Sequence, residues 1–161
     1  MKKIILATAF SLALTLAAAS AARASDGPPK AWQDVRALVV RFNDAQNAHN
    51  LDVVGALMLN SPDFVWEAGN VVELGHDAAV NKLAQIYQGD WRVLPDYGAL
   101  SIELVTPTQA DVTMPTEFKS APAGQDVVTT ESVVRERAVL TPQGWRLVRI
   151  ATDPPPAAFL L

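Results

Sequence analysis

The sequence predicts an α+β domain: a strongly curved, mostly antiparallel sheet with about three N-terminal helices packed on one face. Three observations predict its outline. Apolar residues recur at helical spacing in segments 31–49 and 76–89. Strand-like segments then fill residues 97–152, separated by short connections rich in proline, glycine and serine. Helices gathered before strands are typical of a sheet that is covered on one face.

The first 24 residues have the layout of a cleaved secretory signal peptide. Two lysines precede an apolar run over residues 4–19, and Ala22 and Ala24 form a small-residue cleavage site. The run is 16 residues long, and a membrane-spanning helix needs about 20. We therefore expect a periplasmic or secreted protein that leaves the membrane after cleavage. A retained membrane anchor is the alternative.

Composition limits the classes of function. Cleavage after Ala24 leaves 137 of the 161 residues, which suits one domain. It removes three cations and no acid, so the formal charge of −4 becomes −7. Without a basic cluster, nucleic acid is not an expected partner. The chain has no cysteine, which excludes disulfides, thiol nucleophiles and cysteine metal ligands.

The helical half follows a short linker at residues 25–30. Helix 31–49 carries an apolar stripe, and Asn50 is placed to cap a second short helix, 51–58, through its side-chain carbonyl. Two short strands at 64–66 and 71–74 flank an Ala-Gly-Asn turn. A third helix then occupies 76–89, with Gly89 at its C-terminal end.

The strand half contains four segments, namely 97–106, 109–120, 126–140 and 145–152. Pro115 lies inside the second segment, which predicts an edge position or a bulge. In the last segment Trp145 and Leu147 alternate with Val148 and Ile150, so both faces look apolar. We therefore expect a second copy of the chain to cover the outer face, giving a homodimer.

The tail, residues 153–161, contains three prolines and is expected to be extended. Its last three side chains are apolar, and they either dock on a surface or fray. They are Phe159, Leu160 and Leu161.

Three stretches resemble the SnoaL-like branch of the nuclear transport factor 2-like superfamily: VVRFNDAQNAHNLDVVGALM, DFVWEAGNVVELGHDAAV and GWRLVRI. The resemblance spans residues 31–152. It implies a cone-shaped sheet that encloses a pocket beneath the helices, and often a dimer. Members of the superfamily include ketosteroid isomerases, polyketide cyclases, epoxide hydrolases and proteins with no known reaction. This chain departs from the branch at Asn50, where relatives often have aspartate, and at Ala151, where they often have histidine.

The end of the first helix supplies the leading candidate site. Gln46 and His49 continue its apolar stripe but are polar. Burying an unpaired amide or imidazole costs about 1–3 kcal/mol, and a wet pocket mouth avoids that cost. We expect both to line a ligand pocket, with His49 as the candidate catalytic proton carrier. In the alternative, His49 caps a nearby carbonyl and Gln46 sits at the rim. The stripe comprises positions 32, 35, 39, 42, 46 and 49.

Four further side chains are candidate ligand contacts, with plain core packing as the alternative for each. They are Trp66, Tyr87, Met114 and Thr116. His76 is expected to meet solvent or cap its helix, and no metal-ligand spacing occurs, so no metal is expected.

The carboxylates give no clear catalytic assignment. A base of an isomerase type would come from Asp52, Asp96, Glu117 or Glu131, although exposed carboxylates are usually just solvated. The arginines of the last strands are expected to form cross-strand ion pairs with Glu131 and Glu136. They are Arg135, Arg137 and Arg149.

The sequence thus favours an exported domain that binds a small, largely apolar organic molecule between sheet and helices. Chemistry there would be cofactor-independent acid–base catalysis of the isomerase or cyclase kind, and whether the chain is an enzyme stays open. The alternative is a non-catalytic, dimeric interaction or assembly module that uses the sheet face.

Overall fold

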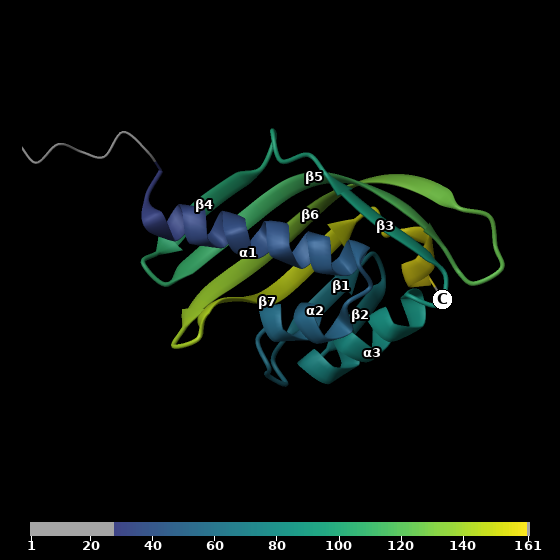
Figure 1. Ribbon diagram of the computed structural model, residues 1–161, viewed down its shortest axis with the longest axis horizontal. Coiled ribbons are helices and arrows are strands. Elements are labelled where there is room, and N and C mark those ends of the chain that lie inside the picture. The colour runs from purple at the N-terminus through teal and green to yellow at the C-terminus, as the bar shows by residue number, and fades with distance from the viewer. Residues whose placement is uncertain (1–27, 161) are drawn as a thin grey trace, which may run out of the picture.

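Residues 28–160, the part of the chain that the computed structural model describes, form three α-helices, one seven-stranded sheet and a short C-terminal 3₁₀ helix (Figure 1). The expected signal peptide at residues 1–24 and the last residue, Leu161, lie outside this part. The helices are α1 (Lys30–Asn47), α2 (Leu51–Leu57), α3 (His76–Ile86) and η1 (Ala157–Leu160). The strands are β1 (Val65–Ala68), β2 (Val71–Leu74), β3 (Asp90–Pro95), β4 (Ser101–Thr106), β5 (Gln109–Ala121), β6 (Val128–Thr141) and β7 (Gly144–Asp153).

The sheet is mostly antiparallel and curved, which confirms the expected α+β class. Its strand order is β2-β1-β7-β6-β5-β3, and β4 pairs with β5 beyond the end of β3. Strands β1 and β7 form a parallel pair, and the other paired strands run antiparallel. Figure 1 shows α1 lying along one face of the long strands, with α2 and α3 near β1, β2 and β7. The face that α1 covers is called the inner face below.

Helix α1 forms for the reason that its sequence suggests. Its apolar stripe is buried against the sheet at Val35, Leu38, Val39 and Phe42. The helix ends at Asn47, however, two residues before the expected end. Asn50 caps α2 as expected, since its Oδ1 accepts a hydrogen bond of 3.1 Å from the backbone N–H of Val53.

A β-bulge corrects the expectation that the last strand is apolar on both faces. Arg137 pairs with Arg149 and the next residue, Ala138, pairs with Leu147, so Val148 is an extra residue without a partner. The extra residue reverses the alternation of side chains. As a result Ile150 joins Leu147 on the inner face, where both are buried.

The outer face is therefore charged rather than apolar. Arg137 donates two hydrogen bonds to Asp111, of 2.7 and 2.9 Å, and Arg149 donates to Glu67 at 2.8 and 2.9 Å. These are the cross-strand ion pairs that the sequence suggested, but their carboxylates are not Glu131 and Glu136. A second copy of the chain was expected on this face because the face looked apolar. Since the face is charged, that reason for a homodimer no longer applies.

Pro115 occupies neither an edge strand nor a bulge, so that expectation is wrong. Strand β5 is flanked by β6 on one side and by both β3 and β4 on the other. Pro115 faces the point where β3 has ended and β4 has not begun, and its carbonyl accepts from the N–H of Asp96 at 2.9 Å. The missing N–H of proline therefore interrupts no ladder.

The tail also differs from expectation, because it ends in a turn of 3₁₀ helix instead of staying extended. Phe159 docks and is 2% exposed, while Leu160 is 61% exposed. The last side chains were expected either to dock on a surface or to fray, and Phe159 docks. This places an aromatic ring from the end of the chain inside the core.

Candidate functional site

A small cavity lies beneath α1, between the inner face of the sheet and η1. Most of its walls are aromatic or aliphatic side chains, and its polar walls come from α1, β6 and β7. The volume open to the centre of a water molecule is about 10 Å³, which suits about one water. The lining residues are Phe42, Asn43, Gln46, Trp66, Trp91, Val93, Phe118, Val134, Glu136, Ile150, Thr152 and Phe159.

Glu136 is the chemically distinctive residue of this cavity. It lies on the inner face of β6, is 4% exposed, and its Oε2 has no hydrogen-bond partner within the described protein. Burial raises the pKa of its carboxyl to about 8, because the charged form is poorly solvated there. At neutral pH the side chain is therefore mainly a neutral carboxylic acid that is able to donate a proton.

Two amides of α1 lie one turn apart beside this acid. The Nε2 of Gln46 donates to the Oδ1 of Asn43 at 3.3 Å. The Nδ2 of Asn43 and the Oε1 of Gln46 have no partner, although both side chains are buried. Two indole N–H groups, of Trp66 and Trp91, are likewise buried and unpartnered. Buried polar groups are normally hydrogen-bonded, so this cluster suits a polar guest.

Tyr97, in the β3–β4 connection, is a titratable neighbour of the cluster. Burial raises the pKa of its phenol, because the charged phenolate is poorly solvated there. The guanidinium of Arg36 lies over the Tyr97 ring, 5.9 Å from its centroid. Tyr97 thus links the polar end of the cavity to the exposed side of α1.

The six residues predicted as ligand contacts lie in three places. Gln46 and Trp66 line the cavity. Met114 and Thr116 are buried on the inner face of β5 without being part of its lining, and the Thr116 hydroxyl donates to the Met114 carbonyl at 3.4 Å.

His49 lies at the protein surface, outside this cavity. Its φ of 51° is in the left-handed region, so the chain has already left the helical path. The imidazole stacks on Tyr87 with ring centroids 4.5 Å apart, and its Nε2–H donates to the Trp91 carbonyl at 3.2 Å. Burial raises the pKa of the Tyr87 phenol. This geometry matches the alternative of a carbonyl-capping histidine, and the site proposed below is built without His49.

None of the four carboxylates suggested from the sequence lines the cavity. Asp52 is exposed in the first turn of α2, and Asp96 accepts from the N–H of Gly98 at 2.9 Å in a surface turn. Glu117 lies 3.3 Å from the Nζ of Lys119, and Glu131 is exposed. Glu136 was not predicted to line a cavity. Because Arg135 and Arg137 flank it in the sequence, it was expected to form a cross-strand ion pair.

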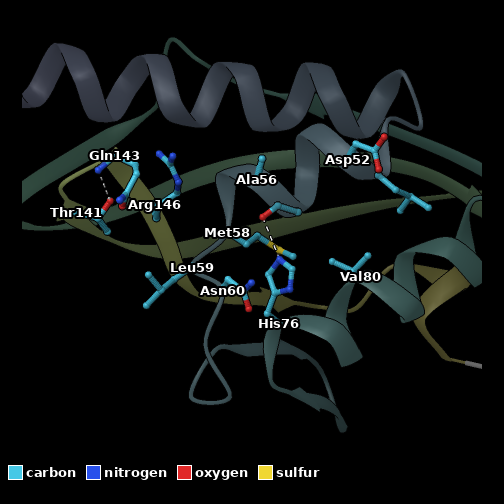
Figure 2. Close-up of a pocket in the computed structure, with 12 residues that line it drawn as sticks. Asp52, Ala56, Met58, Leu59, Asn60, His76, Val80, Thr141, Gln143 and Arg146 are labelled. Carbon is cyan, nitrogen blue, oxygen red and sulfur yellow. Dashed lines mark hydrogen bonds between the residues drawn. The ribbon is translucent and has the colours of Figure 1, made fainter.

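A larger groove opens on the other side of α2, between α2, α3 and the β6–β7 hairpin (Figure 2). It offers about 560 Å³ to the centre of a water molecule. His76 projects into it, donating from Nε2 to the Gly55 carbonyl at 3.0 Å, with Nδ1 2.9 Å from Asp77. Its lining includes none of the buried, unpartnered polar atoms of the described chain. The interior cavity is therefore the stronger candidate site.

No three histidine, aspartate or glutamate side chains in residues 28–160 gather closely enough to hold a metal ion. No helix in this range is long and apolar enough to cross a bilayer.

Solved structures of the same fold cover most of the chain. A candidate aromatic ring hydroxylase from Novosphingobium aromaticivorans superposes with a TM-score of 0.69 at 14% identity, over 84% of this chain and 92% of that one. A nuclear transport factor 2-like superfamily protein from Salmonella enterica gives 0.69 at 15% identity, over 80% and 92%. A candidate scytalone dehydratase from N. aromaticivorans gives 0.66 at 14% identity, over 75% and 81%.

No model of a known protein family matches the sequence, and no curated protein matches it. Identities this low establish the fold alone. The chain has the nuclear transport factor 2-like fold, which confirms the resemblance seen in its sequence at that level.

Proposed function

We propose that the chain binds a small organic molecule in the cavity beneath α1 and that Glu136 presents a proton to it. The observation that carries the proposal is the buried, unpartnered carboxyl of Glu136, whose pKa burial raises to about 8. An acid with such a pKa is matched to proton transfer near neutral pH. A neutral carboxylic acid in an apolar site also serves as a hydrogen-bond donor.

The rest of the cluster suits a ligand that carries an oxygen acceptor. The Asn43 amide and the indoles of Trp66 and Trp91 add N–H donors to the acid. Donors converging on one oxygen stabilise negative charge that develops there during acid–base chemistry. One structure of the same fold is described as a candidate scytalone dehydratase, and dehydration requires a proton donor at the departing hydroxyl. This supports an acid–base enzyme of the isomerase, cyclase or dehydratase kind that uses no cofactor.

Fragment binding with two substitutions tests this function. Small carbonyl compounds that bind are expected to shift the indole N–H resonances of Trp66 and Trp91 in NMR spectra, since both indoles line the cavity. Glu136→Gln keeps a donor of the same shape and is expected to hold affinity within about threefold, while Glu136→Leu loses about tenfold or more. Binding that is indifferent to Glu136→Leu, or shifts confined to the His76 groove, would contradict the proposal.

Export is a separate proposal that rests on the sequence. We propose that the chain is cleaved after Ala24 and acts in the periplasm or outside the cell. The protein purified from its own host should then have the mass of residues 25–161. A mass that retains the first 24 residues would contradict export by cleavage. Native mass spectrometry of the same sample also counts copies, for which the resemblance suggests a dimer.

A further inference from the structure

The end of the chain fills the cavity in which the proposed ligand would bind. Phe159 is 2% exposed, and its ring packs against two indoles. The ring centroids are 5.4 Å apart for Trp66 and 5.8 Å apart for Trp91. These are ordinary separations for aromatic pairs. With Phe159 in place, the open volume of about 10 Å³ leaves no room for an organic molecule.

The segment that carries Phe159, residues 154–160, is called the plug below. It begins with three consecutive prolines, which lack the N–H groups that would extend the ladder of β7. Within the described chain, its hydrogen bonds to the sheet come from two serines. Ser132 donates to the Pro154 carbonyl at 2.7 Å, and Ser120 accepts from the Ala158 N–H at 3.3 Å. The plug is therefore held by these two hydrogen bonds and by the burial of Pro156, Ala158 and Phe159.

Phe159 matches the shape of its site but not its polarity. A phenyl ring carries no oxygen or nitrogen, so Phe159 offers no hydrogen-bond partner to Asn43, Trp66 and Trp91, which line the same cavity with buried, unpartnered N–H groups. The Oε2 atom of Glu136 is likewise buried without a hydrogen-bond partner. A ligand with an aromatic ring and an oxygen acceptor would fill the same space and also satisfy these donors.

We propose that Phe159 occupies the ring position of the ligand and that an aromatic ketone, aldehyde or phenol binds by displacing the plug. This inference rests on the proposed function and names its ligand class. An engineered apolar cavity of roughly 150 Å³ binds benzene, and displacing the Phe159 ring would free the space that one aromatic ring occupies. The chain thus carries a built-in competitor for its own site.

NMR titration with acetophenone tests the plug. Phe159→Ala is expected to bind acetophenone about tenfold or more tightly than the wild-type chain, because the competing ring is gone. Leu160→Ala, one residue away and exposed in the wild type, is the matched control and should bind like the wild type. The indole N–H signals of Trp66 and Trp91 should shift, while that of Trp145, outside the cavity lining, should not.

Two matched probes define the ligand class. Ethylbenzene keeps the ring but lacks the oxygen, and cyclohexyl methyl ketone keeps the oxygen but lacks the aromatic ring. Both are expected to bind Phe159→Ala about tenfold more weakly than acetophenone, since each leaves one feature of the site unmatched. Equal binding of all three probes would overturn the assignment of an aromatic, oxygen-bearing ligand.

The outcomes separate the plug from the function. If Phe159→Ala and wild type bind acetophenone equally and Glu136→Leu still weakens both, the plug is refuted and the proposed function stands. If neither the wild type nor Phe159→Ala binds any probe, the plug proposal and the proposed function are both refuted. Should Phe159→Ala not fold, hydrogen exchange on the wild type decides: saturating acetophenone should speed exchange at the Ala158 and Phe159 amides. Unchanged protection there, with the Trp66 and Trp91 signals shifted, would also refute displacement.

Discussion

The wild-type protein is expected to lose roughly 3 to 4 kcal/mol of its free energy of unfolding between pH 5 and pH 8 through Glu136 alone. Burial raises the pKa of Glu136 from 4.5 to about 8 in the folded chain. Between these values the folded state holds a proton that the unfolded state has released. Stability is therefore highest below the unfolded pKa and falls as pH rises through the folded one.

Urea unfolding at several pH values in this range measures the effect. Glu136→Gln removes the titrating group, so its free energy of unfolding should be nearly flat where that of the wild type falls. Glu131→Gln removes an exposed carboxylate from the same strand and should follow the wild type. Parallel curves for wild type and Glu136→Gln would mean that Glu136 is ionised in the folded protein, contrary to the proposed site.

Gly89→Ala is expected to destabilise the protein by about 3 kcal/mol. Gly89 lies where the chain passes from α3 to β3, against the end of β5. A Cβ added there would sit 2.1 Å from the Ala121 carbonyl oxygen and 2.9 Å from the Ala123 nitrogen. Both are backbone atoms, so the clash cannot be relieved by a side-chain rotation. The backbone itself must shift, which strains the β3–β5 pairing.

Gly98→Ala is the matched control for this substitution. An added Cβ at Gly98 meets just one atom within 4 Å, a side-chain oxygen of Asp96 at 3.1 Å. We expect a change of less than about 1 kcal/mol, since an exposed side chain is able to rotate away. Thermal or urea denaturation of the two variants checks the comparison. A Gly89→Ala variant as stable as Gly98→Ala would show that the α3–β3 connection tolerates a shift.

Local signals predicted most of the fold. The stripe of α1, the Asn50 cap and the Ala-Gly-Asn turn each depend on residues within a few positions of one another. Strand β3 was not predicted, although Trp91 and Val93 are buried and alternate with exposed Arg92 and Leu94. The strand has six residues and ends in a proline, so its pattern is too short to separate from a loop.

Of the two polar residues singled out in the first helix, one lies in the cavity wall and one does not. Gln46 lines the cavity because α1 is still helical there, but the helix ends at Asn47 and His49 turns away from the face that it was expected to share. Glu136 has the same strand parity as Val134 and Ala138, both buried, while Arg135 and Arg137 have the opposite parity. Alternation alone pointed to an inward glutamate.

Long-range contacts decided the features that local patterns could not. The bulge at Val148, which turns Ile150 inward, depends on the pairing of β7 with β6. The docking of Phe159 depends on Trp66 and Trp91, two residues far away in the sequence. Neither arrangement has a signature within its own segment.

The sheet and α1 enclose a carboxylic acid, Glu136, that is neutral in the folded protein at neutral pH. Carbon NMR of the glutamate side-chain carboxyls across a pH titration tests this protonation state most directly, with Glu136→Gln to assign the signal. One glutamate carboxyl is expected to titrate with a pKa of about 8 and to be missing from the variant. If every glutamate carboxyl has ionised by pH 6, the buried acid does not exist and the site proposed around it is contradicted.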